Sequence, residues 1–68
     1  MTFRQFLRSR GVTDDAAGDF VADALEDRTL PRIKSWDVLE GYMRCRHAIP
    51  DAIEAAREVW AEYSATLG

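Results

Sequence analysis

Cysteine and histidine are nearly absent from the chain: each occurs once, as Cys45 and His47. One cysteine excludes an internal disulfide, so the simplest compartment for the protein is a reducing cytoplasm. A zinc site needs about four ligands, mostly cysteine and histidine, and the chain lacks such a set. Because Cys45 and His47 are two residues apart, on a helix they would point about 200° away from each other and could not pair as nucleophile and base. We therefore expect no metal, no cofactor and no enzymatic activity.

Long apolar runs are missing as well. No segment approaches the roughly 18 apolar residues of a membrane span, and the N-terminus lacks the apolar stretch of about 7–15 residues that marks a signal peptide. The four glycines are scattered, so there is no glycine-rich phosphate loop. No segment alternates with the two-residue period of a strand. The sequence thus predicts a cytoplasmic protein that does not associate with membranes and has no sheet.

What the chain does contain fits one helical domain over residues 1–68. Apolar residues make up 47% of it, which argues against disorder. A chain of this size buries roughly 60% of the surface that its unfolded form exposes, so it can fold alone with little stability to spare. The formal charge is −3, so the chain as a whole is not attracted to phosphate backbones or anionic lipid.

The best-patterned segment lies near the C-terminus. Its apolar residues recur at alternating steps of four and three, which places them on one side of an α-helix. These residues are Ile49, Ile53, Ala56, Trp60, Tyr63 and Leu67. Pro50 suits the first helical position because its missing N–H is not needed there. We expect a helix over Pro50–Thr66 on which the other helices pack, with Trp60 as its largest anchor.

Three shorter helices are predicted before it, over Thr2–Arg10, Asp14–Asp27 and Ser35–Arg46. Gly18 is a weak point inside the second of these helices, and we expect it to allow close approach by another helix. The connection over residues 28–34 should insert Leu30 into the core. The predicted core is Phe3, Phe6, Leu7, Phe20, Val21, Leu25, Leu30, Leu39, Tyr42, Met43, Ile53, Val59, Trp60 and Tyr63.

Helix ends carry recognisable signals. Thr2 and Gln5 have the spacing of a capping box, and Gly11 can end the first helix in a left-handed conformation. Thr13 or Asp14 is expected to begin the second helix, and Ser35 can cap the third. Trp36, next to Ser35, has two interpretations: a half-buried contact with the preceding loop, or an exposed aromatic contact.

Aspartate recurs every four residues along the second predicted helix. The row consists of Asp15, Asp19, Asp23 and Asp27. Like charges four residues apart cost roughly 0.2–0.5 kcal/mol per pair in an isolated helix. One interpretation is a solvated face that keeps the protein in solution; the other is a surface that meets a basic protein partner. A bound cation is disfavoured because a straight row of carboxylates cannot surround an ion. A second acidic row, on the last helix, consists of Asp51, Glu54, Glu58 and Glu62.

Basic residues are grouped in two segments that contain no acid. Residues 1–13 carry Arg4, Arg8 and Arg10, and residues 28–34 carry Arg28, Arg32 and Lys34. These charges can cancel against the acidic rows within one molecule. Alternatively they bind the phosphates of a nucleic acid, for which the candidate contacts are Arg4, Arg8, Arg28, Arg32 and Lys34. A third alternative is a head-to-tail contact between copies. Because exposed charge pairs contribute only about 0–1 kcal/mol each, we expect a monomer at micromolar concentration.

The order of residues resembles the YozE-like family of small bacterial proteins. The resemblance begins at Thr2-Phe3-Arg4-Gln5-Phe6-Leu7 and continues through Asp19-Phe20. It includes Glu26-Asp27-Arg28-Thr29-Leu30-Pro31-Arg32, which is similar to the family's Glu-Asp-x-x-Phe-Pro-Lys run. Leu39, Tyr42-Met43 and the ending Val59-Trp60-Ala61-Glu62-Tyr63 complete it.

This resemblance implies an all-α fold, a compact bundle of four to five helices like the sterile alpha motif (SAM). It implies no known chemistry. SAM-like folds include protein-interaction modules and nucleic-acid binders, and nucleic-acid binding has been suggested for the family, so both classes stay open. We expect a non-enzymatic module that binds an unidentified protein through the acidic helix face, with nucleic-acid binding as the alternative.

Overall fold

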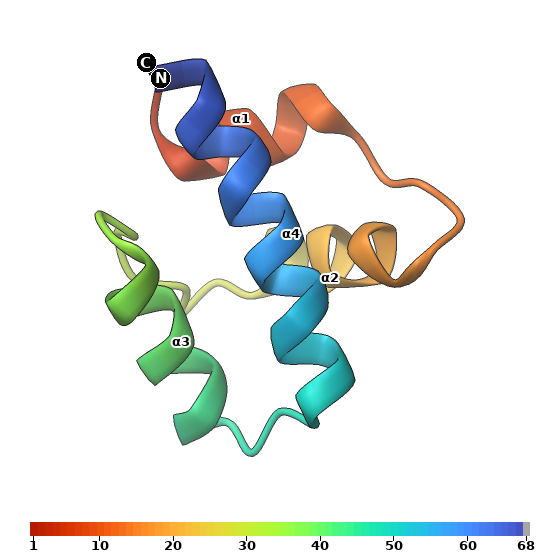
Figure 1. Ribbon diagram of the computed structural model, residues 1–68, viewed down its shortest axis with the longest axis vertical. Helices are drawn as coiled ribbons and strands as arrows, with labels where there is room; N and C mark the ends of the chain where they lie inside the picture. Colours follow the sequence, from red (N-terminus) through yellow and green to blue (C-terminus); the bar gives the residue numbers. More distant parts are fainter. Residues whose placement is uncertain (68) are drawn as a thin grey trace.

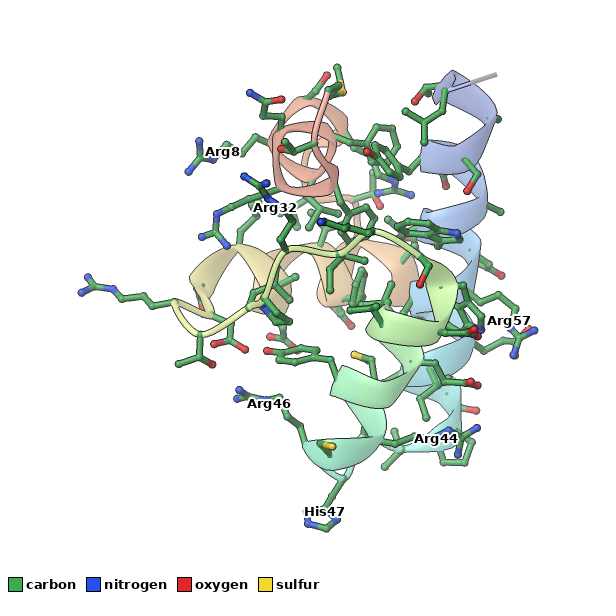
Figure 2. All side chains as sticks on the ribbon, turned by 90° about the vertical axis from the view of Figure 1, so that its left-hand side faces the viewer. Arg8, Arg32, Arg44, Arg46, His47 and Arg57 are labelled. Carbon is green, nitrogen blue, oxygen red and sulfur yellow. The ribbon has the colours of Figure 1, made fainter. Side chains whose placement is uncertain are left out.

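Helix α4 (Pro50–Leu67) is the longest element, and it lies at one edge of the molecule with the other helices packed along it (Figure 1 and Figure 2). The computed structural model describes residues 1–67. Over that range it contains four helices and no strand, and the first three are α1 (Phe3–Arg10), α2 (Ala16–Glu26) and α3 (Trp36–Cys45). α3 lies beside the first half of α4, and α2 crosses behind its middle. The predicted all-α class is confirmed, and each predicted helix is present within two residues of its expected bounds.

Side-chain caps begin α1 and α3 as expected. The hydroxyl of Thr2 accepts the N–H of Gln5 at 3.1 Å, and the Gln5 side chain accepts the N–H of Thr2 at 2.8 Å, which completes a capping box. The hydroxyl of Ser35 accepts the N–H of Val38 at 3.3 Å. At the other end of α1, Gly11 has a positive φ of 79°, which a glycine adopts without strain.

The start of α2 differs from the prediction, because Asp15, rather than Thr13 or Asp14, is the capping residue. Its carboxylate accepts the N–H of Gly18 at 2.8 Å and the hydroxyl of Thr13 at 2.6 Å. The loop therefore folds back over the first turn, and the backbone of Thr13 covers Gly18. A Cβ added at Gly18 would stand 2.5 Å from the carbonyl carbon of Thr13. The expectation that Gly18 admits another helix is wrong: it admits the preceding loop.

His47 ends α3 with a positive φ of 58°. The N–H of His47 donates to the carbonyl of Arg44, and the N–H of Ala48 donates to that of Met43, both at 3.0 Å. These two bonds form a Schellman motif, whose left-handed position glycine usually occupies. His47 adopts this left-handed backbone conformation, and the chain turns sharply there from α3 into α4.

The buried core joins all four helices of the described range. Its residues are Phe3, Leu7, Ala17, Phe20, Val21, Ala24, Ile33, Leu39, Met43, Ile53, Ala55, Ala56, Val59 and Tyr63. The connection inserts Ile33 rather than the predicted Leu30, which is only half-buried. α2 and α4 share the most extensive contact, and each contributes two of the buried alanines. Of the other predicted core residues, those only partly buried are Phe6, Leu25, Tyr42 and Trp60.

Trp60, predicted as a core residue and the largest anchor of α4, packs against the core but is only partly buried. Its ring packs against Phe3 and Tyr63, with centroid separations of 5.3 and 5.2 Å, and the residue remains partly exposed. The ends of the predicted apolar stripe are also exposed, Ile49 by 64% and Leu67 by 59%. Ile49 lies before the first helical turn, and Leu67 lies one turn beyond Tyr63, the last buried residue of α4. The helix therefore buries only its central turns.

Candidate protein-binding groove

A groove of about 730 Å³ lies between α2 and the corner where α3 ends and α4 begins. Its apolar lining comes from α2 on one side and from the α3–α4 corner on the other. These apolar residues are Ala16, Phe20, Ala24, Tyr42, Met43, Ala48, Ile49 and Ala52. Phe20 and Met43 are nearly buried and form part of the core, whereas Tyr42 is half-buried and Ile49 is largely exposed. The groove therefore offers an apolar surface that the chain itself does not cover.

The charged residues around this groove account for the net charge of the whole chain. Five carboxylates and two guanidinium groups line it, which gives a formal charge of −3, and the chain total is also −3. The chain has 12 acids and nine bases, so seven of each remain elsewhere and balance. The charged lining residues are Asp19, Asp23, Glu26, Asp27, Asp51, Arg28 and Arg46. The excess negative charge is thus concentrated at one groove.

Asp19 and Asp23 are the two members of the predicted acidic row that face solvent at the groove. Both are exposed, and neither has an ion-pair partner within the described range of the chain. The same holds for Glu26 and Asp51, which lie outside this row and also line the groove. These four carboxylates are available to a cationic partner.

Asp15 and Asp27, the outer members of the predicted row, have structural roles. Hydrogen bonds from the Thr13 hydroxyl and the Gly18 N–H hold the pKa of Asp15 below its ordinary value of 3.8. Bonds from the hydroxyl and N–H of Thr29 likewise lower the pKa of Asp27. The predicted continuous row is therefore not a single contact surface. A step of four residues turns about 40° beyond a full helical turn, so the row spirals around α2 and its ends act as caps.

Arg46 closes one end of the groove. Its guanidinium lies 2.9 Å from the carboxylate of Asp27 and 5.5 Å from the centre of the Tyr42 ring, and it also donates to the hydroxyl of Thr29. The Asp27 side chain is only 12% exposed. This contact ties α3 to α2 and pairs Asp27 within the molecule, so the uncompensated acids at the groove are Asp19, Asp23, Glu26 and Asp51.

The structure brings three of the five predicted nucleic-acid contacts together. Arg4, Arg32 and Lys34 line a second hollow, of about 640 Å³, between the start of α1 and the 28–34 connection. Arg8 and Arg32 extend into solvent on the same side of the molecule (Figure 2). Arg28 does not join them, because it lines the acidic groove. The side chain of Arg4 also makes a contact within the molecule, since its guanidinium donates a hydrogen bond to the carbonyl of Leu25 at 3.2 Å.

Some of the grouped basic and acidic residues form ion pairs within the molecule, which is one of the interpretations that the sequence allows. Arg10 makes a two-point contact with Glu62, with nitrogen to oxygen distances of 2.8 and 3.2 Å, so α1 does lie beside the second acidic row. The hydrogen bond with Glu62 raises the pKa of Arg10 further above its ordinary value. Arg57 of α4 lies over the half-buried ring of Trp36 in α3, with its guanidinium carbon 5.1 Å from the ring centre. This contact favours the structural interpretation of Trp36.

Cys45 and His47 are both exposed at the end of α3, and His47 points into solvent (Figure 2). Among residues 1–67, no three histidine, cysteine, aspartate or glutamate side chains are grouped so that they could hold a metal ion. None of the helices described over the same residues is both long and apolar enough to span a membrane.

Comparisons with protein-family models, with curated proteins and with solved structures found no match for this chain. The resemblance to the YozE-like family therefore stays a prediction based on its residues.

Proposed function

We propose that the protein is a non-enzymatic interaction module that binds a basic protein partner at the groove beside α2. The observation that carries this proposal is that the groove lining holds the whole excess negative charge of the chain. Asp19 and Asp23 are the central contacts, because they are exposed and have no ion-pair partner over residues 1–67. Complementary charge of this kind steers a partner to the site and excludes partners of like charge.

The magnitudes require more than charge for stable binding. Exposed ion pairs contribute about 0–1 kcal/mol each and weaken as salt is added. Association itself costs at least about 4 kcal/mol in lost freedom of motion. The apolar lining at Tyr42 and Ile49 supports the proposal because it supplies surface whose burial adds to the charge contribution.

The test is affinity capture from a lysate of the source organism with matched charge variants. Asp19→Asn/Asp23→Asn removes two negative charges at the groove. Asp14→Asn/Glu58→Gln removes the same number at exposed positions outside it. We expect one or more basic proteins to be retained by the wild type and by the control variant and to be lost from the groove variant. Identical sets of captured proteins for all three would overturn the proposal.

The second hollow supports an alternative of another class, nucleic-acid binding through Arg4, Arg8, Arg32 and Lys34. The grouping of three of these residues around one hollow favours it, and the net charge of −3 opposes it. Each phosphate contact adds about −0.9 to the slope of log affinity against log salt, so four contacts would give a slope of about −3.6. A mobility-shift titration decides between the classes: absence of binding at micromolar protein and low salt would end this alternative.

A further inference from the structure

We propose that the groove receives a basic amphipathic α-helix, which lays apolar side chains on Tyr42 and Ile49 and lysine or arginine side chains along Asp19 and Asp23. This inference rests on the proposed function and specifies the partner's structure and chemistry. It is carried by three features of the groove: an isoleucine exposed where a polar cap is expected, the spacing of the acids, and the shape of the walls.

Ile49 occupies the capping position of α4, where its carbonyl accepts the N–H groups of Ala52 and Ile53 at 3.0 and 3.1 Å. Serine, threonine, aspartate and asparagine are strongly preferred there, and isoleucine is among the poorest choices because it leaves orphan N–H groups without a side-chain acceptor. The side chain is 64% exposed and lines the groove. A partner's apolar side chain covering Ile49 would bury surface that the isolated chain leaves in water.

The carboxylates of Asp19 and Asp23 are four residues apart on one helix, so their backbones are separated by about 6 Å along its axis. Lysine or arginine residues four apart on a second helix have the same separation, and they can pair with both acids at once. At the far end, Asp27 is already neutralised by Arg46. The partner therefore needs its cations beside Asp19 and Asp23, and it needs none at Asp27.

The walls of the groove favour a helix over the other common forms of bound peptide. An extended peptide gains its affinity by adding to the edge of a sheet, and residues 1–67 contain no strand. A polyproline segment docks between several aromatic rings, whereas Tyr42 is the one partly exposed ring among the lining residues that the structure describes. Helix α2 forms one wall over 11 residues, about 16 Å, which matches three turns of a bound helix.

The experiment uses a fluorescein-labelled synthetic peptide of about 18 residues, acetylated and amidated. Leucines recur at helical spacing on one side, two lysines four apart flank them, and alanine and glutamine fill the rest. One control peptide has the same composition in an order that distributes leucine and lysine around the helix. A second control carries two central prolines, which prevent the helix while keeping the charge. Binding to the full chain is measured by fluorescence anisotropy.

Three protein variants separate the apolar contact from the charges. Ile49→Ser removes the exposed apolar side chain, keeps the charge, and places a favourable cap on α4, so it should fold. Asp19→Asn/Asp23→Asn removes the acids, and Asp14→Asn/Glu58→Gln is the matched control outside the groove. We expect Ile49→Ser and the groove charge variant each to weaken peptide binding about tenfold, and the control variant to change it less than about twofold.

The outcomes distinguish this inference from the function on which it rests. Equal binding of the helical, rearranged and proline peptides, with no effect of Ile49→Ser but a loss on removal of Asp19 and Asp23, would overturn the helical occupant. That result would still support the proposed contact at Asp19 and Asp23. If the charge variants at the groove and outside it bind the peptide alike, both the inference and the proposed function fail. Binding of a duplex oligonucleotide at the groove in place of the peptide would also overturn both.

Discussion

Replacing Gly18 by alanine should destabilise the protein, although the same change inside a helix normally stabilises it. Alanine is favoured over glycine in a helix interior by about 1 kcal/mol. At Gly18 the new Cβ would stand 2.5 Å from the carbonyl carbon of Thr13, so the loop must move away. Overpacking costs about 1–3 kcal/mol, and loss of the bond from the Gly18 N–H to Asp15 costs about 1 kcal/mol more. The net loss is about 2 kcal/mol, or roughly 8–16 °C in the melting temperature.

Gly41 provides the matched control for this prediction. It lies within α3, and a Cβ added there would meet no atom within 4 Å. Gly41→Ala should therefore follow the helix propensity alone and raise the melting temperature by roughly 2–8 °C. Thermal denaturation of the wild type and both variants, followed by far-UV circular dichroism, measures the two shifts. If Gly18→Ala stabilises the protein as Gly41→Ala does, the loop does not cover α2 as described.

Four further predictions concern stability and assembly. The hydrogen bonds that lower the pKa values of Asp15 and Asp27 stabilise the fold above about pH 4, and this stabilisation is lost as pH falls through the pKa values of the folded state. The urea midpoint should therefore drop between about pH 5 and 2, and it should drop less in Asp15→Asn, which keeps a capping side chain. His47→Gly should raise stability by about 0.5–1 kcal/mol in thermal melts by relieving the left-handed backbone. Trp60→Ala should cost about 2 kcal/mol, less than Leu39→Ala, because its ring is only half-buried; a larger loss than Leu39→Ala would contradict this. Sedimentation at micromolar protein in about 0.15 M salt should show a monomer, and a stable dimer there would mean that an apolar surface has been overlooked.

The helices could be predicted from the sequence because their signals are local. A capping box at Thr2, a serine before α3 and a proline at the start of α4 each fix an end through bonds to neighbouring residues. The choice between Leu30 and Ile33 in the connection depends instead on how the chain returns to the core, and periodicity says nothing about it. The predicted core contains no alanine, although Ala17, Ala24, Ala55 and Ala56 are buried. Alanine favours a helix whether it faces the core or solvent, so its presence does not indicate burial.

The groove was only partly predictable. The acidic row lies on α2, which forms one wall of the groove, but which of its members are free depends on capping bonds from Thr13 and Thr29 that no helical pattern reveals. Asp51 and Ile49 join the site because the chain turns sharply after α3, and the left-handed position of His47 gave no signal in the sequence. The available signal was Pro50, which excludes Ile49 from the helix and so from the buried stripe.

The buried alanines of α2 and α4 determine which substitutions the sequence can tolerate as it evolves. Ala17, Ala24, Ala55 and Ala56 are each at most 5% exposed, on the two helices with the most extensive contact. A larger apolar residue at any of them adds volume where no space exists, although its polarity is acceptable. In a library containing every single substitution, these small residues should therefore tolerate fewer replacements than the larger but only partly buried Trp60. Sequences that diverge from this one should likewise keep small residues at these four positions.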